Sequence, residues 1–538
     1  MSESKNKNYL HGAAILAVAT IIVKIIGAIY KVPLYNLLGE EGTSHFGVIN
    51  NVYSLILTIS TAGIPIALSR LVSESLATDH NRQVKRFYSV AMPAFIVIGV
   101  ICMALMAIFR DELAALMGSP EISLGILVLA PAVFFACLIS VYRGYFQGFG
   151  DMVPTAVSQL VEVLCKTVVG FVIVWILLNL GQDSATLSAG AIAGTTAGLA
   201  LCIPVFMFFK SRQNRKTPLI ETGPEPLGRR ESLNLIAKIS APITLSASIT
   251  TILVLIDTAL ILHRLQAGAG LSYETAKILN GVYVKVHSLY NLPLQLIVPL
   301  TVSVVPAITA AVASRRAQES KSIIASSIKI TNLLAMPAGV GLLVLAYPIL
   351  YVLWPESNEN GTALLAMLGI VSYFACINLT TTAILQAAGF EKFTLYIIPL
   401  AGLIRIALSW FLIGNPAVNI FGAPIAALVY HIFITAAQLI YIARKVPNAP
   451  PLSGTFVKPV LCTGIMGLAA WAVYGLCDKF LSGFFDGGRL PLLIFLCAAI
   501  GVAVLVYALL IIVSGAITRE DLKLIPKGEK LANLLKIK

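Results

Sequence analysis

Residues 88–109 read YSVAMPAFIVIGVICMALMAIF, and residues 490–515 read LPLLIFLCAAIGVAVLVYALLIIVSG. Neither stretch carries a charged side chain, and each is at least as long as the roughly 20 apolar residues that cross a bilayer as a helix. Apolar and polar residues do not alternate along them, as they do in the strands of a membrane β-barrel. These two stretches therefore predict an all-α protein that spans a membrane.

The same pattern recurs along the whole chain of 538 residues, which is 58% hydrophobic and only 12% charged. A soluble domain has about twice that share of charged residues. We expect about 14 transmembrane helices and hence a polytopic membrane protein. The predicted spans are 13–34, 45–69, 88–109, 122–147, 155–180, 187–209, 233–262, 278–306, 324–350, 363–388, 393–414, 421–443, 456–477 and 490–515.

The chain has a net charge of +13, and its Lys and Arg residues are unevenly distributed between the loops on the two sides of the membrane. With the N-terminus inside, and with Arg143 and Lys458 at the inner ends of their spans counted as inner, 26 of the 38 Lys and Arg residues are inner and 5 are outer, which leaves 7 within spans. This asymmetry predicts that both termini are cytoplasmic and that the protein lies in the cell membrane. Because the positive charge is spread over loops, we expect no nucleic-acid partner. The outer cations are Arg110, Arg264, Lys277, Lys479 and Arg489.

Two sequence repeats divide the chain into halves. Gly47-Val48 in the second predicted span recurs as Gly281-Val282 in the eighth, and Gln147-(x2)-Gly150 recurs as Gln386-(x2)-Gly389. Matching positions in helices of matching order predict two six-helix lobes in a parallel repeat, followed by two C-terminal helices. The expected domains are an N-terminal lobe (1–209), a basic cytoplasmic linker (210–232), a C-terminal lobe (233–443), and the last two helices with a basic tail (444–538).

Besides the two cations counted as inner at span ends, seven cations fall inside predicted spans, where charge is costly. A cation at the bilayer centre costs roughly 2.5–3.5 kcal/mol even on a lenient insertion scale. Lys24, Lys166 and Arg405 lie near the midpoints of their spans, and Lys285 lies two turns into its own. These side chains must face water, a counter-charge or an anionic ligand. The full set is Lys24, Lys31, Lys166, Lys238, Lys285, Lys329 and Arg405.

Counter-charges within the spans are fewer than the cations. Glu162 lies one turn from Lys166 on the same predicted helix, so the two are expected to pair. Asp257 is expected either to neutralise Lys24, Lys31 or Lys285 or to bind a coupling cation. The excess of cations predicts an interior that suits an anionic substrate.

Neutral polar residues form stripes on two of the predicted helices. Asn50 and Asn51 belong to a stripe on the second span, and Asn291 belongs to one on the eighth. Such stripes are explained either by hydrogen bonds between helices or by a water-filled cavity. Their presence on equivalent helices of both halves favours the cavity.

Several classes of protein are excluded by missing motifs. The sequence contains no Walker A motif, no GxGxxG between a strand and a helix, no HExxH and no GxSxG. We therefore expect no enzyme activity and no cofactor, apart from a coupling ion of unknown identity. The six histidines are isolated in the sequence, so no metal site is predicted.

Two segments resemble a known superfamily. Residues 23–31 (VKIIGAIYK) with Leu38-Gly39 resemble the first-helix signature of the MOP superfamily of flippases. Residues 142–148 (YRGYFQG) and 152–162 (MVPTAVSQLVE) resemble the branch of stage V sporulation protein B and YtgP-like polysaccharide-biosynthesis proteins. The resemblance covers essentially the whole chain.

This resemblance implies a V-shaped transporter with a central cavity. It would move lipid II or another undecaprenyl-pyrophosphate-linked glycan from the inner to the outer leaflet, surrounded by membrane lipids and acting as a monomer. Lys24 stands where lipid II flippases carry an essential arginine, whereas Tyr30 stands at the next arginine position with Lys31 beside it. The substrate-binding residues expected on this basis are Lys24, Lys31, Lys166, Lys285 and Arg405 for the phosphates, Asn50, Asn51 and Asn291 for sugar or peptide, and Asp257.

Two other functions fit the same sequence. A MATE-type multidrug antiporter would share the fold but requires buried acids to couple export to protons or sodium, and here cations outnumber acids. A scaffold that only organises cell-wall enzymes would use the 210–232 loop or the 518–538 tail. Such a scaffold has little reason to retain charges at mid-membrane.

Overall fold

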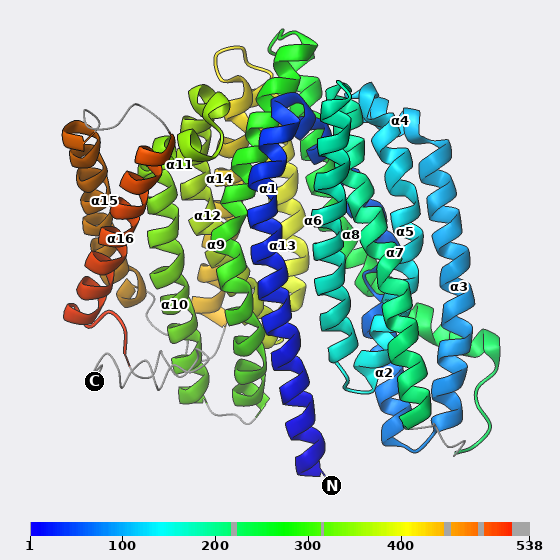
Figure 1. Cartoon of the computed structure of the whole chain (residues 1–538). Helices are drawn as coiled ribbons and strands as arrows, with labels where there is room; N and C mark the ends of the chain where they lie inside the picture. Colours follow the sequence, from blue (N-terminus) through cyan, green and yellow to red (C-terminus); the bar gives the residue numbers. More distant parts are fainter. Residues whose placement is uncertain (1, 217–222, 314–316, 446–452, 482–488, 519–538) are drawn as a thin grey trace. The chain divides into compact units, whose positions relative to one another are not determined.

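The computed structural model describes residues 2–216, 223–313, 317–445, 453–481 and 489–518. Every regular element in these ranges is an α-helix or a short 3-10 helix, so the all-α prediction is confirmed (Figure 1). The N-terminal half contains α1 (Ser2–Thr61), α2 (Ile64–Ala77), α3 (Asn81–Ile108), α4 (Arg110–Leu116), η1 (Pro120–Ile122), α5 (Ser123–Gly148), α6 (Val153–Asn179) and α7 (Ser184–Lys216). The remainder contains α8 (Arg229–Ala267), α9 (Tyr273–Ala313), α10 (Ala317–Val344), α11 (Ala346–Leu353), η2 (Pro355–Ser357), α12 (Asn358–Ala387), α13 (Glu391–Ile413), η3 (Asn419–Phe421), α14 (Gly422–Lys445), α15 (Ser453–Leu481) and α16 (Arg489–Val513).

Twelve segments of the described chain are long and apolar enough to cross a membrane. The first of them, Val18–Ala77, covers two predicted spans, because the expected loop at 35–44 is helical. The predicted span 278–306 lies within α9, which is not among the twelve. The polytopic character is thus confirmed, and the count of fourteen stays a prediction.

Two glycines interrupt the path of the chain through its first two predicted spans. Gly39 has φ 67° and ψ −168°, a left-handed conformation that glycine adopts without a steric penalty, and it kinks α1. The second interruption separates α1 from α2 at Ala62 and Gly63. There the Gly63 N–H donates to Thr244 Oγ1 of α8 at 3.1 Å. A side chain therefore satisfies a backbone donor that the break removes from the helical ladder.

The order of elements repeats between the two halves. Helices α3, α4, η1 and α5 are matched by α10, α11, η2 and α12: in each half a long helix is followed by a short helix, a 3-10 turn and another long helix. Helices α5 and α12 also end alike, since Gly150 and Gly389 both have positive φ (75° and 84°). Their N–H groups donate to Gln147 and Gln386 at 2.9 and 3.2 Å. These shared helix ends support the predicted repeat.

The packing divides the chain into two compact units. Unit 1 comprises residues 1–266 and 271–281, and unit 2 comprises residues 267–270 and 282–538. Helix α8 and the first turns of α9 therefore pack with unit 1, whereas the repeat assigns their predicted spans to the second lobe. The domain limits predicted from the repeat stay a prediction, and 217–222 of the linker and 519–538 of the tail lie outside the described residues.

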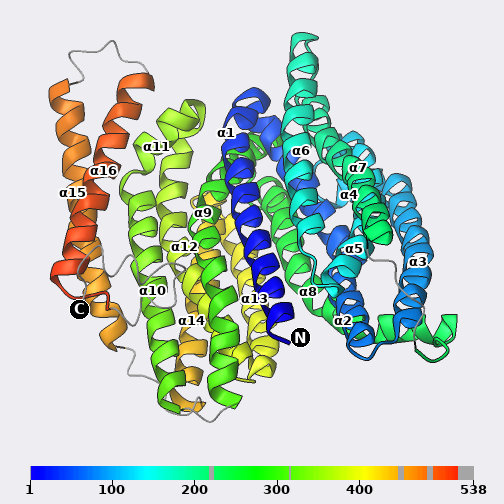
Figure 2. The same ribbon diagram turned by 60° about the horizontal axis from the view of Figure 1, so that its bottom comes forward.

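The two C-terminal helices belong to unit 2. Helices α15 and α16 lie side by side next to α10 in both views (Figure 1 and Figure 2). Apolar side chains of α15 and α16, Met466 and Leu496 among them, form a buried cluster with Leu345. Tyr507 anchors α16 by donating a hydrogen bond from its hydroxyl to the carbonyl oxygen of Leu333 at 2.8 Å.

Candidate functional site

Three of the predicted intramembrane cations lie on two helices of unit 1. Lys24 and Lys31 are half-buried on α1, and Lys166 is half-buried on α6. Lys31 and Lys166 are close enough to repel each other electrostatically. Helices α1 and α6 pack together, and Thr20 Oγ1 donates to Gln159 Oε1 across them at 3.2 Å. Two cations from distant parts of the sequence therefore lie on packed helices of one lobe, within electrostatic range of each other, and an anion would relieve their repulsion.

Glu162, the acid predicted to pair with Lys166, makes its ion pair with a different residue. Glu162 Oε2 on α6 accepts from Arg143 Nη2 on α5 at 3.0 Å, with both side chains about three-quarters buried. Lys166 lies one turn after Glu162 on α6, and the carboxylate of Glu162 attracts its ammonium group electrostatically. Because Glu162 is shared with Arg143, it neutralises Lys166 only in part.

The polar stripe of α1 makes hydrogen bonds to its own helix and to α8. Asn50 donates to the carbonyl oxygen of Phe46 at 2.7 Å, a bond within one turn. Asn51 donates to Thr258 Oγ1 on α8 at 2.9 Å. Asp257, the neighbour of Thr258, is 6% exposed. Part of the stripe therefore joins helices, which is the simpler of the two explanations that the sequence left open.

The other predicted site residues lie in unit 2. Lys285 on α9 is 1% exposed and donates from Nζ to Ser357 Oγ at 3.0 Å. The guanidinium of Arg405 on α13 lies 5.6 Å from the ring centre of Tyr430 on α14, within cation–π distance. Asn291 donates to the carbonyl oxygen of His287 at 2.9 Å. The structure thus distributes the nine predicted residues over both units, six in unit 1 and three in unit 2.

A charged cluster in unit 1 was missed by sequence reasoning. Lys277, counted as an outer-loop cation, is 1% exposed in the first turns of α9. Its Nζ donates to Glu41 of α1 and to Glu121 Oε2 of η1 at 3.1 Å, and it pairs with Glu274 Oε2 at 3.1 Å. Burial by itself would lower the pKa of Lys277, but the hydrogen bonds to the three carboxylates outweigh it and raise the pKa above its ordinary value. Lys277 therefore stays charged throughout the physiological range.

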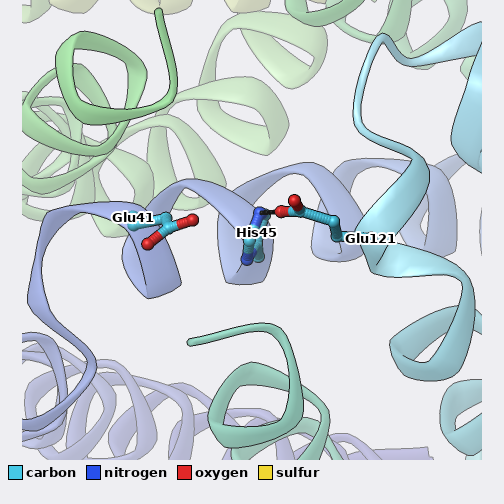
Figure 3. Close-up of side chains that lie close together, drawn as sticks. All are labelled: Glu41, His45 and Glu121. Carbon is cyan, nitrogen blue, oxygen red and sulfur yellow. Dashed lines mark ion pairs between the residues drawn. The ribbon is translucent and has the colours of Figure 1, made fainter. Parts of the chain in front are cut away.

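His45 completes this cluster (Figure 3). It lies one helical turn after Glu41 on α1, and its Nε2 is 3.0 Å from Glu121 Oε2. The spacing of Glu41 and His45, four residues apart and directly after the glycine kink, was the one signal in the sequence that could have pointed here. The other partners are distant in sequence: Lys277 is separated from Glu41 by 236 residues and from Glu121 by 156.

The long apolar helices, the repeated order of elements and the charges inside the spans define a polytopic membrane protein with a transporter fold. The chain belongs to the polysaccharide biosynthesis protein family, whose model matches residues 9–312. The resemblance of the two sequence segments to polysaccharide-biosynthesis proteins is thereby confirmed.

Three proteins of Bacillus subtilis (strain 168) are similar over nearly the whole chain. The membrane protein YabM is 27% identical over 98% of this chain and 96% of its own length. Stage V sporulation protein B is 22% identical, over 97% and 98%. Lipid II flippase MurJ is 24% identical, over 93% and 94%. The chain is therefore similar in length and sequence to each of them.

Solved structures show the same fold. A lipid II flippase MurJ in an inward closed conformation matches with a TM-score of 0.66 at 17% identity, over 92% of this chain and 98% of that one. An inward-facing multidrug resistance MATE family transporter of the MOP superfamily matches with a TM-score of 0.64 at 16% identity, over 78% and 97%. The MATE structure covers less of the present chain than the MurJ structure does.

Proposed function

We propose that this protein is a flippase that moves an undecaprenyl-pyrophosphate-linked glycan, such as lipid II, from the inner to the outer leaflet by alternating access. The observation that carries the proposal is that Lys24 and Lys31 of α1 and Lys166 of α6 are half-buried on two helices that pack together within unit 1. Two like charges held together in an apolar lobe raise the energy of the empty state. A pyrophosphate with about two negative charges would lower it.

The surroundings of the two lysines support an anionic ligand over an internal counter-ion. Glu162 is already engaged by Arg143 at 3.0 Å. Lys24, about two turns before Lys31 on α1, adds a third cation to the same helix pair. Donors from α1 and α6 together would replace the water that a pyrophosphate loses on entering the lobe.

The lipid-linked character of the substrate is supported by the relatives. One of the similar proteins is named a lipid II flippase, and the family is named for polysaccharide biosynthesis. Within this proposal, Arg405 and Lys285 of unit 2 contact the headgroup at a second stage of the cycle, and Asn50, Asn51 and Asn291 contact sugar or peptide. Asp257 would neutralise a lysine of unit 1 or bind a coupling ion.

A MATE-like antiporter is the second candidate. The fold match to a multidrug resistance transporter favours it, together with the burial of Asp257 on α8. An antiporter of this kind would move cationic compounds, and the cations of α1 and α6 would repel them. The charge balance of unit 1 therefore favours the flippase.

The two candidates are separated by reconstituting the purified chain into liposomes. One set carries a labelled undecaprenyl-pyrophosphate glycan whose leaflet is read with a membrane-impermeant reagent. A second set carries a fluorescent cationic dye and a proton or sodium gradient. The flippase proposal expects exchange of the lipid and no gradient-driven dye transport, and it fails if only the dye moves.

A further inference from the structure

The cluster around His45 brings together three side chains that can ligate a metal ion. Glu41, His45 and Glu121 each offer one nitrogen or oxygen, and these atoms all lie within 4.8 Å of one another (Figure 3). Glu41 and His45 come from adjacent turns of α1, and Glu121 comes from η1. The kink at Gly39 precedes both α1 residues and sets the direction in which that segment of the helix leaves.

The imidazole of His45 is the second observation. Its side chain is fully buried, at 0% exposure, and its Nδ1 makes no hydrogen bond within the part of the chain that the structure describes. Its Nε2 lies 3.0 Å from Glu121 Oε2, so the ring faces that carboxylate. A buried polar atom without a partner is costly, and a ligand that accepts the nitrogen lone pair removes that cost.

The charges around His45 do not balance. Three carboxylates, those of Glu41, Glu121 and Glu274, meet the single ammonium of Lys277. With His45 neutral, two negative charges remain. Protonation of His45 would cancel one of them, and a divalent cation would cancel both.

The chemistry of the ligand set indicates which cation. One imidazole nitrogen with two carboxylate oxygens is typical of zinc and related divalent transition metals. Magnesium and calcium prefer sites made of oxygen alone. We propose that Glu41, His45 and Glu121 form a binding site for a divalent transition-metal ion of the zinc class, in competition with the ammonium of Lys277.

Lys277 explains how the site could alternate between two cations. Its ammonium contacts Glu41 and Glu121, the two carboxylates that a metal would use. Its third partner, Glu274, lies three residues earlier on α9 and is not one of the three ligands. When metal binds, Lys277 retains its ion pair with Glu274 and loses those with Glu41 and Glu121. Metal binding thus frees the first turns of α9 from α1 and η1, a consequence independent of the lipid substrate.

The proposal is tested on the full-length protein in detergent, stripped with EDTA and titrated with ZnCl₂ by calorimetry. We expect one equivalent to bind to the unchanged protein. His45→Gln should weaken binding at least about tenfold, because it removes the nitrogen ligand. Lys277→Met should tighten binding by roughly tenfold or more, because it removes the competing positive charge.

Two controls keep the test decisive. His263→Gln removes another histidine of unit 1, whose Nε2 lies 3.0 Å from the carbonyl oxygen of Leu116, and should leave zinc binding unchanged. Tighter binding by Lys277→Met is a gain, so misfolding cannot imitate it. The proposal is overturned if the unchanged protein and Lys277→Met bind no more zinc than His45→Gln. It is also overturned if His263→Gln weakens zinc binding as much as His45→Gln does.

Discussion

Gly281 is the position at which one added methyl group should do most damage. A Cβ built on this residue of α9 would lie 1.8 Å from the carbonyl oxygen of Glu40 and 2.5 Å from its carbonyl carbon. Ordinary contacts begin near 3.4 Å, so backbone would have to move by about 1.6 Å. Neither atom belongs to a side chain that can rotate away. The substitution Gly281→Ala therefore forces α9 and α1 apart where Lys277 and Glu41 join them.

The magnitude follows from two opposing terms. Overpacking of a close contact costs typically 1–3 kcal/mol, and a clash with rigid backbone belongs at the upper end. Replacing glycine by alanine inside a helix stabilises the helix by up to about 1 kcal/mol, because alanine has the higher helix propensity. We expect a net loss of about 2 kcal/mol in the free energy of unfolding. For a domain of roughly 150–250 residues this corresponds to a fall of roughly 4–8 °C in the unfolding temperature.

The assay is thermal unfolding of the purified protein in detergent, with Gly341→Ala as the matched control. Gly341 lies inside α10, and a Cβ there would meet no atom within 4 Å. The control should be neutral or slightly stabilising. Equal unfolding temperatures for Gly281→Ala and Gly341→Ala would refute the close approach of α9 to Glu40.

Three further predictions concern pairs of residues within single units. Thr244→Val removes the acceptor of the Gly63 N–H and should cost about 1 kcal/mol of unfolding free energy in chemical denaturation; Thr244→Ser should retain most of it. Removing Arg143 and Glu162 singly and together, as glutamines, should give a coupling energy of about 1 kcal/mol in a double-mutant cycle, and additive effects would contradict the ion pair. Gln438 is fully buried, accepts from Thr381 and donates to Thr382 at 2.9 Å, so Gln438→Leu should cost about 1–3 kcal/mol by thermal unfolding, whereas an unchanged protein would show that these bonds add nothing.

The sequence was sufficient for the fold class because length and apolar composition act locally. Stretches such as 88–109 and 490–515 need no knowledge of their neighbours to be recognised as spanning helices. The helix ends at Gly150 and Gly389 were also visible as a repeated motif, since a left-handed glycine depends on its own few residues. The break between the first two predicted spans is shorter than the 35–44 gap, because helix continues on both sides of the kink at Gly39.

The site was accessible from the sequence only in part. Each cation of the spans could be found by its cost in the bilayer, but the approach of Lys31 to Lys166 depends on how α1 packs on α6. Arg143 was counted as an inner cation because it lies near a predicted helix end, and its ion pair with Glu162 was missed. Lys277 was likewise counted by its position in an outer loop. Its burial depends on carboxylates far away in the sequence, which no local pattern reveals.

The central claim is that the cations of α1 and α6 bind the phosphates of a lipid-linked glycan. The most direct measurement is the rate at which labelled lipid II changes leaflet in liposomes that contain the purified protein, its Lys31→Gln and Lys166→Gln variants, or Lys238→Gln. Lys238 is an exposed cation of α8 and serves as the matched control. The account predicts at least about a tenfold loss of rate for each of the first two variants, equivalent to about 1.4 kcal/mol, and an unchanged rate for the control. Full activity of Lys31→Gln and Lys166→Gln would contradict it.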